Sequence, residues 1–281
     1  MSRIFCIMRI ALYETRLMLL SSRFLILSVI SYIFMDAAMR PVRQFAADYH
    51  LGIVPAVMPF YGASITYANI ALLLLILLYS DIPLKGDGQR FLIIRGRSLA
   101  GCAVGHVISL IITGVVFVLE QLLFSVITAL PSVSFGGGWQ KVWGSIASGR
   151  ALSLGYLFGL GVSDVVIRTY TPIQAVTCSA FLFLLIGCIY ALIEFLLNGI
   201  SRGKLGTVVL SVWSVGWIFL ERSHVPILRK LLKYSPQTWN DLSQMEMADL
   251  PGKAGFLAAI IFVLALVLIL LVKYRKIELV K

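Results

Sequence analysis

Two long apolar runs constrain the fold of this chain more than any other feature of its sequence. Residues 63–79 carry no charge, and residues 99–130 carry only His106 and Glu120 as ionisable side chains. Runs of this length are typical of membrane-spanning helices, because a bilayer leaves each backbone polar group to be satisfied within the segment. The chain of 281 residues is also 59% hydrophobic and 13% charged, which predicts an all-α membrane protein.

The apolar runs predict six transmembrane helices within a single transmembrane domain, 1–281. They cover about residues 24–39, 60–79, 99–124, 172–198, 205–220 and 254–272. Residues 1–22 differ, because Arg9 and Arg16 lie seven positions apart on one helical face while apolar residues cover the rest. This pattern predicts an amphipathic N-terminal helix lying on the membrane interface, and the alternative is that it simply begins the first span.

Three segments are predicted to connect the spans on the outer side of the membrane. Residues 40–59 contain three prolines and are predicted to form a loop. Residues 151–161 are apolar but contain three glycines, which favours an outer, partly buried helix, with a re-entrant segment as the alternative. Residues 227–233 alternate apolar and basic positions with a helical period, which predicts another short outer-face helix.

The distribution of positive charge predicts the orientation of the chain. Fourteen of the 24 Lys and Arg residues fall in four short segments, and their density there is about twice that of the outer segments. These segments are 1–23, 81–98, 199–204 and 273–281. Because short basic segments stay in the cytoplasm, we expect both termini to be cytoplasmic. The net charge of +11 then reflects topology, and no nucleic-acid partner is expected.

No catalytic constellation is found in the sequence. It lacks a P-loop and the G-x-S-x-G and H-E-x-x-H motifs, the three histidines have no metal-ligand spacing, and the four cysteines form no C-x-x-C pair. We therefore predict no catalytic residues, no metal and no cofactor bound by this chain, and the chain itself is not expected to be an enzyme.

The third span is predicted to contact protein along one face. Small residues recur every fourth position at Gly101, Gly105, Ser109 and Thr113, and such ridges let membrane helices approach closely. His106 lies beside them and is interpreted as a neutral packing histidine, with a proton relay as the alternative. Counting along the helix from residue 99 places Glu120 about 32 Å away, at the outer boundary of the membrane.

The segment between the second and third spans is short, basic and interrupted by turns. Asp81-Ile-Pro83 ends the preceding helix, because proline lacks an amide hydrogen and disfavours helix before it. A glycine turn at residues 86–88 then leads into residues 89–94, whose sequence is QRFLII. This stretch is predicted to be a small helix on the membrane face that can bind another protein.

In the order and spacing of these features, the chain resembles the permease subunits of bacterial ATP-binding-cassette (ABC) transporters of the type-2 exporter class, in particular the compact permeases of Gram-positive bacteria. The residues that carry the resemblance are the amphipathic N-terminal helix, the loop from Asp81-Ile-Pro83 to Arg95-Gly-Arg97, the following Gly101, and Tyr234-Ser-Pro236 with Trp239. The chain departs from the family where Leu99-Ala100 replaces an aromatic residue expected before Gly101.

The resemblance implies a subunit in the bacterial plasma membrane that pairs with a second permease, identical or related. Two copies of an ABC ATPase would bind below and carry ATP and Mg²⁺. The coupling contact would comprise Gln89, Arg90, Phe91, Leu92 and Arg95, and a cargo path or gate would involve His106, Glu120 and Trp239. The implied cargo is amphipathic or hydrophobic: a peptide, a drug or a lipid. A non-transporting membrane sensor or immunity protein, or an integral-membrane enzyme, are the alternatives.

Overall fold

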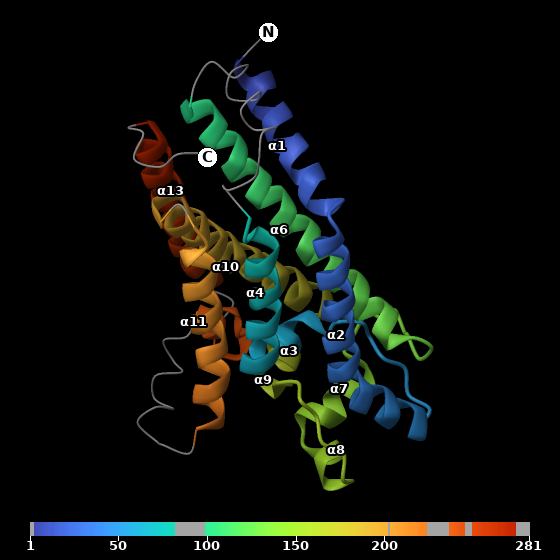
Figure 1. Ribbon diagram of the computed structural model, residues 1–281. Helices are drawn as coiled ribbons and strands as arrows, with labels where there is room; N and C mark the ends of the chain where they lie inside the picture. Colours follow the sequence, from blue (N-terminus) through green and yellow to red (C-terminus); the bar gives the residue numbers. More distant parts are fainter. Residues whose placement is uncertain (1–2, 82–98, 202, 224–235, 245–248, 274–281) are drawn as a thin grey trace.

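A computed structural model describes residues 3–81, 99–201, 203–223, 236–244 and 249–273, which form helices joined by short connections (Figure 1). These residues contain no β-strand beyond one isolated bridge. The helices are α1 (Arg3–Leu19), α2 (Ser22–Asp48), α3 (Met58–Ala63), α4 (Ile65–Tyr79), α6 (Leu99–Ala129), α7 (Gln140–Ala147), α8 (Arg150–Ser153), α9 (Asp164–Thr169), α10 (Pro172–Ser201), α11 (Leu205–Arg222), η2 (Pro236–Asn240), η3 (Leu242–Gln244) and α13 (Leu250–Lys273).

Five of the described helices, α2, α6, α10, α11 and α13, are long and apolar enough to cross a membrane. The chain is therefore a multi-pass membrane protein. The end of α4 and the turn between α10 and α11 lie toward one end of the bundle, which we call the Asp81 end. The short helices α7, α8 and α9 lie at the opposite end, the α8 end (Figure 1). The start of α1 and the end of α13 both lie at the Asp81 end.

Helix α4 occupies the middle of the bundle. It is apolar on all sides and nine of its 15 residues are buried, because α2, α10 and α11 pack around it. A helix that is hydrophobic all round is stable only when surrounded in this way or by lipid. It runs antiparallel to α11 and is bonded to it at both ends: the Thr66 hydroxyl donates to Glu221 over 2.7 Å, and Asp81 pairs with Lys204.

The second predicted span is wrong as a single helix over residues 60–79. The chain turns at Ser64, whose backbone is extended with ψ 116°, and α3 precedes that turn as a separate helix. The reason is packing: the turn carries Phe60 to a fully buried position between Trp139 and Trp143, with ring centroids 5.2 Å and 4.9 Å away. The remaining α4 is about 22 Å long, shorter than a ~30 Å hydrocarbon core.

The first predicted span, 24–39, is too short, and the predicted loop 40–59 is helical over its first half. Helix α2 continues through Pro41 to Asp48. A proline removes one helical hydrogen bond, but Val42, Phe45 and Ala46 on the following turns are buried, so packing outweighs that loss. Arg43 adds an ion pair of 2.6 Å with Asp36 and a 3.0 Å bond to the carbonyl of Thr128 on α6.

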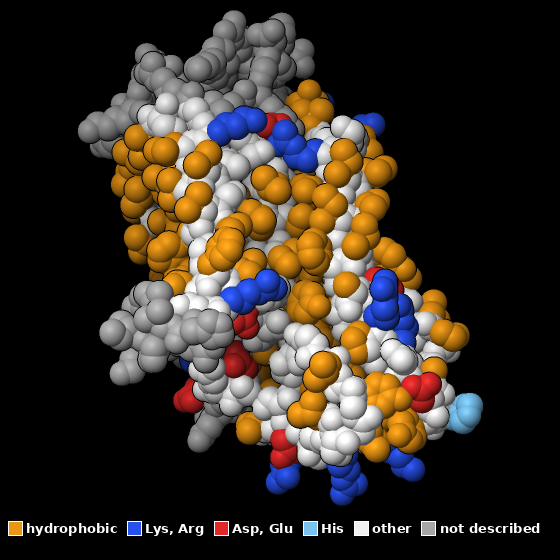
Figure 2. Space-filling model, turned by 60° about the horizontal axis from the view of Figure 1, so that its bottom comes forward, with side chains coloured by type: hydrophobic (Ala, Val, Ile, Leu, Met, Phe, Trp, Pro, Cys, Tyr) orange, Lys and Arg blue, Asp and Glu red, His pale blue; other side chains and the backbone are white. Residues whose placement is uncertain are grey.

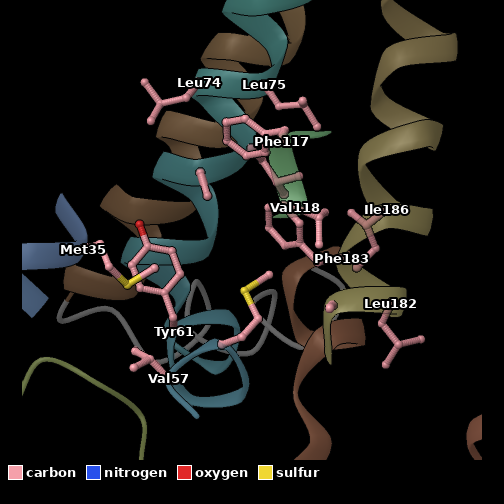
Figure 3. Packing of buried hydrophobic residues seen from close by; sticks show 14 of the residues in the cluster. Met35, Val57, Tyr61, Leu74, Leu75, Phe117, Val118, Leu182, Phe183 and Ile186 are labelled. Carbon is pink, nitrogen blue, oxygen red and sulfur yellow. The ribbon is translucent and has the colours of Figure 1, made fainter. Parts of the chain in front are cut away.

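The core lies where α2, α3, α4, α6 and α10 meet, and Figure 3 shows part of it. Side chains from all five helices converge there, and most of them are fully buried. They include Met35, Tyr61, Leu74, Leu75, Phe117, Val118, Leu182, Phe183 and Ile186. These contacts join segments more than a hundred residues apart, so the described helices form one packed unit.

The α8 end is a compact layer of short elements. Ile53 pairs with the strand-like segment 132–134 through two backbone bonds of 2.7 and 2.8 Å, and the Trp143 indole donates to the carbonyl of Val54 over 2.8 Å. The Tyr156 hydroxyl bonds to Asp48, and this hydrogen bond raises the pKa of Tyr156 to about 12.

The predicted outer helix over residues 151–161 is wrong. Only α8 is helical there, and residues 154–163 run as irregular chain. Gly155 has φ 91°, a left-handed conformation that favours glycine and ends the helix. The adjoining aromatic residues Tyr156 and Phe158 pack against Phe45 of α2, with ring centroids 5.1 and 6.3 Å away. Segment 151–171 thus covers the end of the bundle.

Helix α1 forms as predicted but does not lie free on a surface. It runs alongside the first half of α6 in the same direction, and α2 then follows the second half (Figure 1). The face turned to α6 is buried at Ile10, Ala11 and Met18, whereas Ile4 and Leu12 on the outward side are 73% and 56% exposed. Both faces of α1 are therefore largely apolar.

Candidate functional site

An ion-pair cluster joins three helices at the Asp81 end of the bundle. Arg23, near the start of α2, pairs with Asp81 over 2.9 Å and donates to the Ser80 hydroxyl over 2.6 Å. Lys204, in the turn between α10 and α11, approaches the other oxygen of Asp81 at 3.5 Å. We call Arg23, Ser80, Asp81 and Lys204 the Asp81 cluster. It brings together three of the short basic segments that the sequence identified, 1–23, 81–98 and 199–204.

A buried polar network lies where α10 packs on α11. The Glu194 carboxylate, 1% exposed, accepts a 2.6 Å hydrogen bond from the Thr207 hydroxyl. Asn198, fully buried, accepts the Gly206 backbone amide at 2.8 Å. Gly206 is required for this approach, because a Cβ there would lie 2.6 Å from the Glu194 carbonyl. The network fixes the angle between the two helices at the turn that carries Lys204.

A second polar contact is buried between α1 and α6. Glu14 and His106 form a direct ion-pair or hydrogen-bond contact through Nδ1, and both side chains are almost fully buried. Next to them, the hydroxyls of Thr15 and Ser109 lie 3.2 Å apart. The His106 ring also packs on Phe195 of α10, with centroids 5.6 Å apart. We call Glu14, Thr15, His106 and Ser109 the α1–α6 seam.

The predicted small-residue ridge of the third span forms part of this seam. A Cβ at Gly105 would lie 2.8 Å from the Cγ2 of Ile10 and 3.3 Å from the carbonyl of Ile7. Ser109 and Thr113 are fully buried, and Gly101 is partly exposed at the start of the helix. The residue against which Gly105 packs therefore belongs to α1 of the same chain.

The other predicted gate residues lie apart from one another. Glu120 lies beside Ser28, two turns into α2, and therefore not at the α8 end. The count from residue 99 misplaced it because α6 begins beyond the Asp81 end: the Tyr79 hydroxyl at the end of α4 donates to Leu110 over 2.8 Å. Trp239 lies in η2 at the α8 end, packed partly buried against the core. His106, Glu120 and Trp239 thus form no common site.

The predicted coupling residues Gln89, Arg90, Phe91, Leu92 and Arg95 lie outside the described residues. Two groups that the structure brings together were missed by sequence reasoning. Sequence reasoning gave Glu14 no role, although it follows Ile10 and precedes Met18 at four-residue spacing. That position within an apolar stripe was the available signal. Arg23 and Asp81 lie 58 positions apart in the chain, and no signal in the sequence indicated that they pair.

The chemistry available at these sites is electrostatic and structural. No group of three His, Cys, Asp or Glu side chains that could hold a metal ion occurs in the described part of the chain. The Asp81 cluster ties helix ends together with charged groups, whereas the seam joins α1 to α6 within the length of both helices.

The chain matches no protein-family model, no curated protein and no solved structure.

Proposed function

We propose that this chain is the transmembrane subunit of an ATP-driven ABC exporter, which moves an amphipathic or hydrophobic cargo across a bacterial plasma membrane. The proposal includes six passes, counting α3 with α4 as one, and cytoplasmic termini. It also includes two ATPase subunits below the membrane and a second permease subunit, identical or related, beside this chain in the lipid.

The Asp81 cluster is the observation that carries the proposal. Asp81 begins the basic segment 81–98, which contains the residues that we propose bind the ATPase, and it is ion-paired to α2 through Arg23 and to the α10–α11 turn through Lys204. A displacement of that segment would therefore be delivered to several spans together. Rigid-body movement of packed helices is the usual form of such transitions.

Two features add support. The seam places α1 firmly on α6, so that α1 and the start of α6 extend beyond the end of α4 on the side of the basic segments (Figure 1). Such a projection suits a contact with a peripheral subunit. In addition, Figure 2 shows a band of hydrophobic side chains between the charged side chains near the top of the view and those of its lower half, as expected of a bundle immersed in lipid.

The test separates ATPase binding from coupling. The tagged chain is co-expressed with the products of the genes that neighbour its own, purified in detergent and assayed for a bound ABC ATPase and for cargo-stimulated hydrolysis. Phe91→Ala should release the ATPase, because loss of a buried aromatic contact costs about 1–3 kcal/mol. Asp81→Asn should keep the ATPase but lose the cargo stimulation, since the ion pairs to Arg23 and Lys204 are removed.

The matched control is Asp164→Asn, which removes an ion pair of 2.7 Å with Arg168 on the exposed α8 end. It should leave both readouts unchanged. A wild-type chain that purifies without any ATPase, under conditions in which it is folded, would contradict the exporter and favour the membrane sensor or immunity protein. An Asp81→Asn variant with normal stimulation would remove the cluster from the mechanism.

A further inference from the structure

An apolar pocket with a volume of about 510 Å³ opens at the α8 end, where α10 begins. Its walls come from the segment before α3, the glycine-rich segment after α6, and the first two turns of α10. The lining residues are Val54, Pro55, Ala56, Phe135, Gly136, Gly137, Thr171, Pro172, Ile173, Val176 and Thr177. None of these side chains is charged, and the volume lies within the range of small-molecule sites, about 300–1,000 Å³.

One wall of the pocket is held in place by hydrogen bonds that leave its backbone satisfied. The carbonyl of Val54 accepts both the Ala56 amide and the Trp143 indole at 2.8 Å, and the carbonyl of Pro55 accepts the Ser125 hydroxyl at 3.1 Å. Both lone pairs of the Val54 carbonyl are therefore engaged, while the Pro55 carbonyl shares the Ser125 hydrogen with the carbonyl of Leu122. An extended peptide in the pocket would bring unpaired backbone groups that this wall could not satisfy, which is costly in an apolar site.

Exposed apolar side chains flank the mouth of the pocket. Phe135 and Ile173 at its rim are 77% and 80% exposed, which is an unfavourable arrangement in water but not beside lipid. Helix α10 has 30 residues and is about 45 Å long, so it exceeds a ~30 Å hydrocarbon core by a few residues at each end. Its first turns thus lie in the interfacial region, and its exposed face continues from Ile173 to Phe181, which is 49% exposed.

We propose that this pocket binds one acyl chain of a membrane phospholipid from the leaflet on the α8 side. The uncharged lining excludes a headgroup, the satisfied wall disfavours a peptide, and the rim is continuous with a lipid-facing helix surface. The headgroup would remain outside, at the level of the interface. This inference requires only that the bundle lies in a membrane, and it does not depend on the exporter proposal.

The experiment uses the full chain in nanodiscs that contain phosphatidylglycerol with a photoreactive diazirine in one acyl chain. After irradiation, cross-linked peptides are identified by mass spectrometry. The expected result is preferential labelling of residues 135–137 and 173–177. Val176→Trp fills the pocket from α10 and should reduce this labelling by about tenfold. A tenfold reduction corresponds to a loss of ~1.4 kcal/mol in the free energy of lipid binding.

The matched control is Val165→Trp, since Val165 lies on α9, is 50% exposed and does not line the pocket. If Val176→Trp fails to fold, Gly137→Leu replaces it, with Gly144→Leu as its control, because a Cβ at either glycine meets no atom within 4 Å. Labelling that is unaffected by the filling variants, or that is equally strong on the exposed faces of α11 and α13, overturns the proposal. Cross-linking that is displaced by an apolar peptide but not by unlabelled phospholipid does so as well.

Discussion

At the residue scale, the α1–α6 seam shows how two ionisable side chains can be buried in a largely apolar interface. Glu14 and His106 are 6% and 3% exposed, and each satisfies a polar atom of the other. The sequence predicted that His106 is a packed histidine in the third span, but it gave no partner for it. A single sequence does not encode which residue of another helix lies opposite, so Glu14 could not be assigned.

This pairing leads to a prediction about stability. Glu14→Leu should destabilise the chain by about 1–3 kcal/mol, because the buried His106 ring loses a polar partner. His106→Leu in the same chain should restore part of that loss, since two apolar residues leave no orphaned polar group. Thermal unfolding in detergent measures both variants. Strictly additive effects of the two substitutions would contradict the pairing.

At the element scale, sequence pattern predicted the long spans well and the connections poorly. The predicted spans 172–198, 205–220 and 254–272 correspond to α10, α11 and α13 within a few residues at most ends. Apolar runs of this length are sufficient to identify such helices. The errors at Pro41, Ser64 and residues 151–161 have one cause: tertiary packing of Phe45, Phe60 and their neighbours decided the local backbone, and local sequence does not report it.

The contact of α1 with α6 gives a prediction at the same scale. Gly105→Leu should separate the two helices, because even a Cβ at this position would lie 2.8 Å from Ile10 and close to a backbone carbonyl of α1. Hydrogen exchange of residues 3–19 in detergent should then rise strongly. Gly144→Leu is the control, since its Cβ meets open space. Unchanged protection of α1 in the Gly105 variant would show that the two helices are not closely packed.

At the scale of the whole molecule, the first and last described helices place both ends of the described chain on one side of the bundle. This agrees with an even number of membrane crossings. The start of α1 and the end of α13 lie at the Asp81 end, as do the two basic connections represented by Asp81 and Lys204. The described part of the α8 end holds Lys141, Arg150 and Arg168 on short helices. The fold alone does not distinguish inside from outside. The density of Lys and Arg, which is about twofold higher in the segments of the Asp81 end, predicts that this end faces the cytoplasm.

The orientation is therefore testable with single cysteines in intact cells. A cysteine at Lys141, an exposed position on α7, should react with a membrane-impermeant thiol reagent. One at Lys85, in the basic segment that follows Asp81, should react only after the membrane is permeabilised, because the positive-inside rule places it in the cytoplasm. The native cysteines Cys102 and Cys188 are buried and Cys178 is partly buried, so a background with all four native cysteines replaced by alanine serves as the blank. Labelling of Lys85→Cys in intact cells, with none at Lys141→Cys, would invert the topology and place the Asp81 cluster outside, out of reach of any cytoplasmic ATPase.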